Sequence, residues 1–114
     1  MVDATQAQRD LCQRVGVKPD AVLPDQVVGV GPMQALPING LRHAAAGRAS
    51  GWYLWAGGEI DQSDPSFLRS VHAAHLGDVH PEVVPYLALP PGWRFQIAPG
   101  HEDVWFDASL VEAE

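Results

Sequence analysis

The hydrophobic pattern of the chain is densest in residues 50–61, which read SGWYLWAGGEID. In a strand, Trp52 and Leu54 would lie on one face of a sheet, and Tyr53 and Trp55 on the other. A sheet with one solvated face shows alternating apolar and polar side chains, whereas both phases are apolar here. The segment therefore predicts a strand that is buried on both faces or that presents aromatic side chains to a partner on one face.

A second strong pattern lies near the C-terminal end of the sequence. Residues 93–100, WRFQIAPG, alternate between apolar and polar side chains, as expected of a half-buried strand. GHED at 100–103 predicts a turn, and VWFD at 104–107 predicts another short strand, so the three segments together predict a hairpin. Its inward apolar side chains would pack beside Trp52 and Leu54, which we assign to the core.

The first element is predicted to be a helix. An apolar stripe at three-to-four spacing extends from Ala4 to Val15, Asp3 can cap the helix, and Gly16 would end it. The short β-branched run at 27–31, VVGVG, then predicts a strand.

A central pair of helices is predicted from capping residues and helical spacing. Asp64 followed by Pro65 is a strong helix start, apolar side chains lie at helical spacing over 67–76, and Gly77 would end that helix. A second, short helix would follow before LPPG at 89–92, which predicts a tight turn.

Residues 37–51 are rich in glycine and small side chains, and Asn39-Gly40 is a turn signal. The sequence therefore predicts a long loop, and such loops often carry function. Three basic side chains would be exposed on it: Arg42, His43 and Arg48.

The order of helix, strands, helices and hairpin is typical of the α+β class. We predict a single domain over 1–114, with an N-terminal helix over 1–16 and a small, largely antiparallel β-sheet. The central helical pair would pack with that helix on one face of the sheet. An apolar fraction of 46% is ordinary for a globular chain of this size.

Charged residues are unevenly distributed along the chain. The net charge is −7, and residues 59–114 carry ten acidic but only two basic residues. We therefore expect neither nucleic acid nor an anionic membrane surface as a partner, because both are held largely by Lys and Arg. A basic protein is the electrostatically favoured partner, although acidity also serves solubility alone. The polar start without a signal peptide and the single cysteine, Cys12, predict a cytoplasmic protein.

Histidines offer one alternative chemistry. His72 and His75 lie three residues apart on the predicted helix, and His80 could join them in a metal site or a small metalloenzyme. The HAAH spacing lacks the glutamate and the four-residue interval of the HExxH pattern. We therefore favour half-buried and solvated histidines over a metal site, and expect no cofactor.

Acidic and aromatic side chains form the preferred candidate site. Two acidic groups follow the aromatic strand and the hairpin turn, and they would meet if the two strands are neighbours. Aromatic side chains with a charged rim have the composition of a protein-binding hot spot. The predicted partner-binding residues are Tyr53, Trp55, Glu59, Asp61, Glu102 and Asp103. A small-ligand pocket in which Arg42 or Arg94 binds an anion is a further alternative.

Several strings along the chain carry a family resemblance: LPINGLRH at 36–43, SGWYLWAGGE at 50–59, FLRSVHAAHL at 67–76, VVPYLALPPGWRF at 83–95 and EDVWFD at 102–107. Together they resemble family thirty-three of the polymorphic-toxin immunity proteins over about residues 27–111. The resemblance implies a non-enzymatic cytoplasmic protein that binds and blocks a cognate toxin, and it brings no catalytic residues with it.

Overall fold

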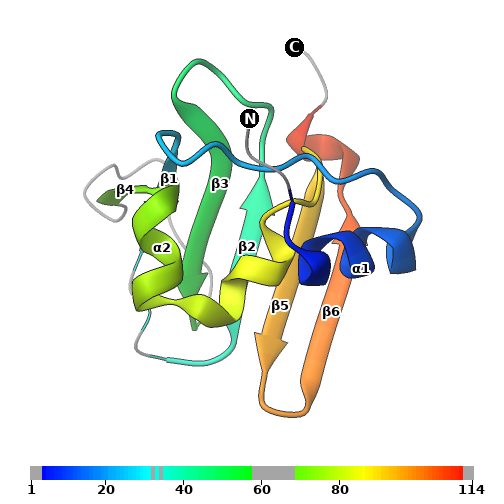
Figure 1. Ribbon diagram of the computed structural model, residues 1–114. Coiled ribbons are helices and arrows are strands. Elements are labelled where there is room, and N and C mark those ends of the chain that lie inside the picture. The colour runs from blue at the N-terminus through cyan, green and yellow to red at the C-terminus, as the bar shows by residue number, and fades with distance from the viewer. Residues whose placement is uncertain (1–3, 32, 34, 58–68, 112–114) are drawn as a thin grey trace.

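The computed structural model describes residues 4–31, 33, 35–57 and 69–111, and its centre is a six-stranded mixed sheet (Figure 1). The strands follow the spatial order β4-β1-β3-β2-β5-β6. Only β1 and β3 run parallel, and the other neighbouring strands are antiparallel. The bounds of the strands are β1 Val27–Val30, β2 Ile38–Arg42, β3 Ala49–Ala56, β4 Arg69–His72, β5 Trp93–Ala98 and β6 His101–Phe106.

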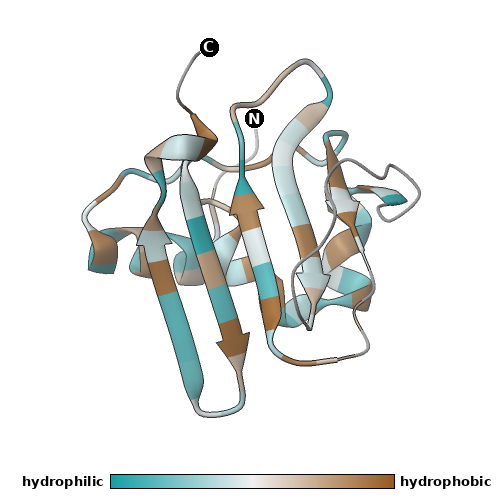
Figure 2. Cartoon of the chain, turned by 180° about the vertical axis from the view of Figure 1, so that it is seen from behind, coloured by the Kyte–Doolittle hydropathy of each residue, from teal (hydrophilic) through white to brown (hydrophobic). Residues whose placement is uncertain are grey.

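The helices lie together on one side of this sheet. They are α1 (Gln6–Val15), α2 (Ala73–Val79) and the 3₁₀ segment η2 (Pro81–Tyr86). A separate short 3₁₀ turn, η3 (Ala108–Leu110), follows the last strand. Figure 1 shows α1, α2 and η2 in front of the strands, and Figure 2 shows the same sheet from behind, where these helices lie beyond it. The fold is therefore α+β, as predicted.

Helix α1 forms where the apolar stripe predicts it, and Gly16 ends it in the left-handed conformation (φ 81°). The expected cap, Asp3, lies outside the described residues. The N-cap is Thr5, whose side chain accepts a hydrogen bond from the Gln8 amide while the Gln8 side chain accepts one from the Thr5 amide. This reciprocal capping box satisfies two amide groups that the first helical turn leaves unpaired.

The prediction of a loop over 37–51 is wrong for most of its length, because residues 38–42 form β2 between β3 and β5 and residues 49–51 begin β3. Residues 43–48 lie outside the strands, as predicted. The Asn39-Gly40 pair is not a turn: Asn39 pairs with Trp55 on one neighbour, and Gly40 pairs with Phe95 on the other. A Cβ atom on Gly40 would lie 2.2 Å from the Phe95 ring. The glycine is therefore there to let an aromatic ring lie against the backbone.

The predicted helix over 67–76 is also partly wrong. Its predicted start at Asp64-Pro65 lies outside the described residues, and residues 69–72 form β4, which pairs antiparallel with β1. The helix begins at Ala73 and continues through Gly77, which was expected to end it. Edge pairing with β1 supplies backbone hydrogen bonds that local helical spacing cannot anticipate.

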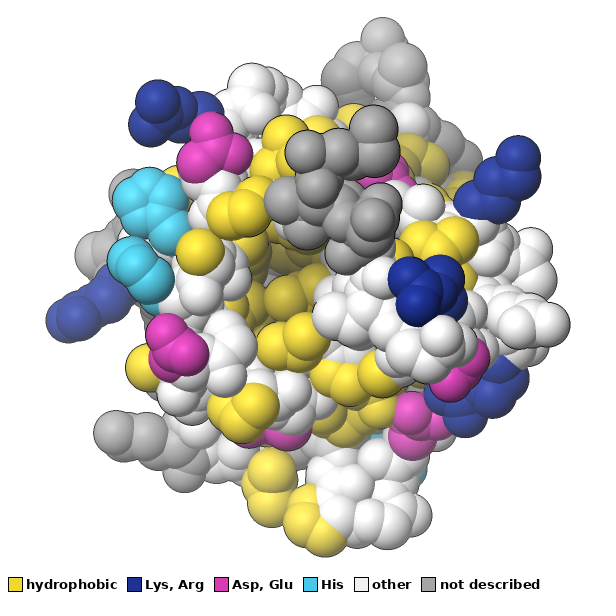
Figure 3. All heavy atoms as spheres, viewed as in Figure 1, with side chains coloured by type: hydrophobic (Ala, Val, Ile, Leu, Met, Phe, Trp, Pro, Cys, Tyr) yellow, Lys and Arg dark blue, Asp and Glu magenta, His cyan; other side chains and the backbone are white. Residues whose placement is uncertain are grey.

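The core lies between the sheet and the helices. Trp52 and Leu54 are fully buried there, as predicted, together with Phe95 from the confirmed hairpin. The Phe95 ring is stacked on Tyr86 of η2, with ring centroids 4.6 Å apart. Strand β6 begins at His101, earlier than expected, because the turn takes only Pro99 and Gly100. Seen from the helix side, hydrophobic side chains gather in the middle of the molecule, and charged side chains lie toward its rim (Figure 3).

Candidate partner-binding surface

The sheet separates the predicted binding residues onto two faces. Tyr53 and Trp55 point away from the helices, because their neighbours Trp52 and Leu54 point into the core. We call this side of the sheet, opposite to α1, α2 and η2, the helix-free face. Through the pairing register, Asp103 of β6 lies on it as well. Glu102 lies on the opposite face, and Glu59 and Asp61 lie outside the described residues.

Trp55 contributes to a shallow pocket on the helix-free face. The pocket has a volume of about 270 Å³ and is lined by Asn39, Trp55, Gly57, Arg94, Phe95, Gln96 and Trp105. Only 6% of Trp55 is exposed, so the side chain is part of the pocket floor rather than a projecting contact. At Trp55, strand β3 is therefore buried on the helix-free face as well as on the helix side, where Trp52 and Leu54 lie.

Amide side chains connect the strands across this face. Gln96 Nε2 donates to Asn39 Oδ1 at 3.0 Å, and Asn39 Nδ2 donates to the Gly57 carbonyl at 3.0 Å. His101 lies 3.2 Å from Gln96 Oε1 and 3.4 Å from an Asp103 carboxylate oxygen. These hydrogen bonds fix the positions of polar groups at the surface of the sheet.

Arg94 and Trp105 form a cation–π pair on this face. Neither is among the predicted partner-binding residues, although Arg94 is named as an alternative anion-binding residue. The Arg94 guanidinium lies 5.5 Å from the Trp105 ring centroid and 3.1 Å from a carboxylate oxygen of Asp107. Trp105 remains 39% exposed, which makes it the accessible aromatic side chain beside the pocket. Strand alternation could have found the pair, because Arg94 and Trp105 occupy the outward phase of the hairpin.

Tyr53 packs at the other end of the face. Its ring makes an edge contact with His43, with centroids 5.5 Å apart, and His43 Nδ1 lies 3.2 Å from the Leu110 carbonyl of η3. Both side chains are partly exposed. His43 lies in the segment between β2 and β3, outside both strands as predicted, and it connects this segment to η3.

Arg42 has a structural position and is unsuitable for binding a ligand. It was expected to be exposed, but only 2% of the residue is accessible. Its guanidinium donates to three main-chain carbonyls, those of Asp20, Ser50 and Leu89. Burial lowers the pKa of Arg42, and the carbonyl oxygens compensate the buried charge.

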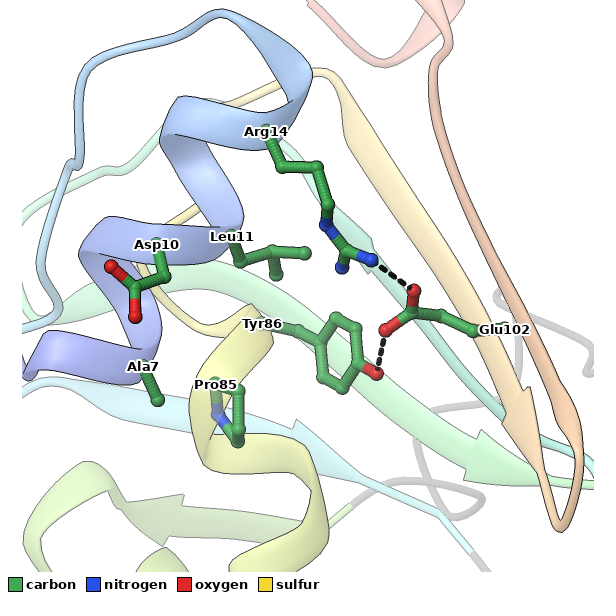
Figure 4. Close-up of a pocket in the computed structure, with 7 residues that line it drawn as sticks. All are labelled: Ala7, Asp10, Leu11, Arg14, Pro85, Tyr86 and Glu102. Atoms are coloured by element: carbon green, nitrogen blue, oxygen red, sulfur yellow. Dashed lines mark hydrogen bonds and ion pairs between the residues drawn. The ribbon is translucent and has the colours of Figure 1, made fainter.

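Glu102 is held on the helix side of the sheet, where α1, η2 and β6 meet around a pocket of about 320 Å³ (Figure 4). Arg14 lies 2.9 Å from one carboxylate oxygen, and Tyr86 donates its hydroxyl to the other at 2.5 Å. The hydrogen bonds from Arg14 and Tyr86 lower the pKa of Glu102, whereas burial and Glu102 raise the pKa of Tyr86. Both carboxylate oxygens are therefore occupied within the chain.

The histidines proposed as metal ligands are only partly brought together. The rings of His72 and His75 make an edge contact with centroids 5.9 Å apart, whereas His80 lies 3.7 Å from Glu82. Within the described part of the chain, no group of three histidine, cysteine or carboxylate side chains is placed to hold a metal ion. Four-coordinate zinc needs three or four such ligands, so the described residues do not fit it.

One family model covers most of the chain. The model of the Imm33-like domain matches residues 7–107, a span that includes nearly all of α1 and all six strands. The chain belongs to the Imm33-like family. No curated protein and no solved structure matches it. The expected resemblance to family thirty-three of the immunity proteins is thus confirmed, and membership of the Imm33-like family suggests a non-enzymatic role with a protein as partner.

Among the described residues, no helix is long and apolar enough to cross a membrane.

Proposed function

We propose that this Imm33-like protein is a non-enzymatic, cytoplasmic immunity protein that binds and neutralises a cognate toxin. The observation that carries the proposal is the family match over residues 7–107. The charge distribution supports it, since ten of the fourteen acidic residues lie in the second half of the chain. An acidic inhibitor and a basic toxin would attract each other at long range, which speeds encounter and disfavours wrong partners.

The helix-free face is the surface we propose for the toxin. It combines two aromatic side chains, the partly exposed Tyr53 and the exposed Trp105, with the exposed carboxylate of Asp103 and the polar groups around Arg94. Trp55 supports this surface from below. Binding energy in protein interfaces concentrates in a few aromatic and arginine side chains surrounded by polar groups, and this face has that composition.

The proposal is tested by co-expression of the chain with the toxin encoded beside its gene. Growth should be restored by the wild-type chain, and a catalytically inactive form of the toxin should co-purify with it. If the wild-type chain neither restores growth nor binds the toxin, the proposed function is wrong.

A pair of variants tests the surface. Trp105→Ala should weaken toxin binding at least about 30-fold, the size of effect expected for a central hot-spot residue. Val79→Ala, an exposed apolar side chain on α2, is the matched control and should leave the affinity unchanged. Equal affinity for the two variants would exclude Trp105 from the interface.

A further inference from the structure

Among the strands of the described residues, β6 (His101–Phe106) is the last in the sheet and has a neighbouring strand on only one side. Residues in an antiparallel ladder alternate between facing their neighbour and facing away from it. The Asp107 amide donates to the Gly92 carbonyl on the β5 side at 2.7 Å. By alternation, Asp103 and Trp105 also face β5, while the amide and carbonyl groups of Glu102, Val104 and Phe106 point away from the sheet.

This edge carries two acidic side chains, Glu102 and Asp103, but lacks other features that commonly protect an exposed strand. Its six residues pair with β5 in an unbroken register without a bulge, and they contain neither lysine nor proline. In Figure 1, α1 lies in the helix layer in front of β5 and β6 rather than in the plane of the sheet beside β6. The opposite edge, β4, has only four residues and leads directly into α2.

The side chains of β6 differ between its two halves. Glu102 and Asp103 place carboxylates on the two faces of the first half. Trp105 and Phe106 place aromatic rings on the two faces of the second half, and they are 39% and 51% exposed. Figure 2 shows the same change along β6, from hydrophilic near the hairpin turn to hydrophobic toward its end. A strand added here would meet acidic groups at one end and apolar groups at the other.

We propose that a β-strand of the toxin pairs with β6 and extends the sheet to a seventh strand, an inference that rests on the proposed function above. Its backbone would bond to the outward groups of Glu102, Val104 and Phe106. A basic side chain of the toxin strand would lie beside Asp103, whose carboxylate is 62% exposed, and apolar ones would lie beside the aromatic rings. Charge complementarity favours this occupant over a second copy of the chain, because each copy has a net charge of −7.

A proline in β6 tests the proposal, because proline cannot donate a backbone hydrogen bond. Val104→Pro removes an outward-facing amide and spares the bonds to β5, and Val104→Ala is the matched control for the lost side chain. Ser70→Pro is the control for the opposite edge. The Ala73 amide donates to the Gln26 carbonyl, so by the same alternation the Ser70 amide points away from β1. Circular dichroism and thermal unfolding would establish that each variant is folded.

Affinity for the catalytically inactive toxin is then measured by calorimetry. We expect Val104→Pro to bind at least about 10-fold more weakly than Val104→Ala, and Ser70→Pro to bind within about 2-fold of wild type. Amide exchange on the wild-type chain gives a second readout, independent of any variant. The amides of Glu102, Val104 and Phe106 should exchange rapidly in the free protein and slowly in the complex.

The possible outcomes separate the two proposals. If Val104→Pro binds as well as Val104→Ala and the three outward amides stay unprotected, edge pairing is wrong while the immunity function stands. If the wild-type chain does not bind the toxin at all, the function itself fails, and edge pairing falls with it. If the free wild-type chain is a dimer that Val104→Pro converts to a monomer, a second copy occupies the edge, which also overturns the proposal.

Discussion

Replacement of Arg42 by methionine tests whether this buried guanidinium holds the fold together. Arg42 connects three separate segments, since it donates to the carbonyls of Asp20, Ser50 and Leu89 at 2.7, 3.1 and 2.7 Å. Methionine has a similar length and would keep much of the packing. It would leave all three carbonyls without their donor.

The expected loss of stability follows from those carbonyls. A buried carbonyl without a partner costs about 1–3 kcal/mol, and the bonds to Ser50 and Leu89 are buried while the bond to Asp20 is partly buried. The variant no longer buries the positive charge of Arg42, and this gain offsets part of that cost. In a buried salt bridge both partners can be replaced by apolar side chains, but these acceptors belong to the main chain and remain. We therefore expect Arg42→Met to lower the free energy of unfolding by about 3 kcal/mol, from a total of about 5–15 kcal/mol.

The assay is urea unfolding followed by tryptophan fluorescence, with the slope of the transition compared between variants. Arg48→Met is the matched control, because Arg48 is exposed and its loss should change the unfolding free energy by less than about 0.5 kcal/mol. If Arg42→Met were as stable as the control, the three hydrogen bonds of Arg42 would not stabilise the fold. Greater stability than wild type would show that the cost of burying the charge exceeds the value of its three hydrogen bonds.

Three further predictions concern the core, the first helix and pH. Gly40→Ala should lower the unfolding free energy by at least about 1–3 kcal/mol, because its methyl group would overlap the Phe95 ring; an unchanged urea midpoint would contradict this. Thr5→Ala should cost about 1 kcal/mol through loss of the capping box, whereas Thr5→Ser should retain most of that stability in the same assay. The pKa of Glu102 is lowered by the bonds from Arg14 and Tyr86, so its stabilisation is present above the unfolded-state value of about 4.3 and lost as pH falls through the folded-state pKa. The carboxylate is partly exposed, so the effect should be about 1 kcal/mol or less, and urea unfolding at pH 7 and pH 3 should show a smaller pH dependence for Glu102→Gln than for wild type.

The candidate site was predictable only in part. Alternation places Tyr53, Trp55 and Asp103 on the helix-free face once the pairing of their strands is known. Alternation does not show that only 6% of Trp55 is exposed. Glu102 looks like an exposed acid beside Asp103 in the sequence, but it faces η2 and α1, where distant residues occupy its carboxylate.

Local sequence signals are sufficient to specify α1 and the hairpin of β5 and β6. The apolar stripe ended by Gly16 specifies α1, and the alternation after Trp93 specifies the hairpin of β5 and β6. In these segments the hydrophobic period, the capping residues and the turn residues all favour the same structure, so neighbouring residues suffice to predict it.

The central strand β2 and the buried position of Arg42 depend on contacts between residues that are distant in sequence. Asn39-Gly40 is a turn signal by itself and becomes strand because β3 and β5 pair on both sides of it, with Phe95 packed against the glycine. Arg42 looks like a surface cation until Asp20 and Leu89, both distant in sequence, bring their carbonyls to it. Non-local hydrogen bonds and close packing outweigh local preferences in both cases, because a buried backbone or charge must find its partners wherever the fold places them.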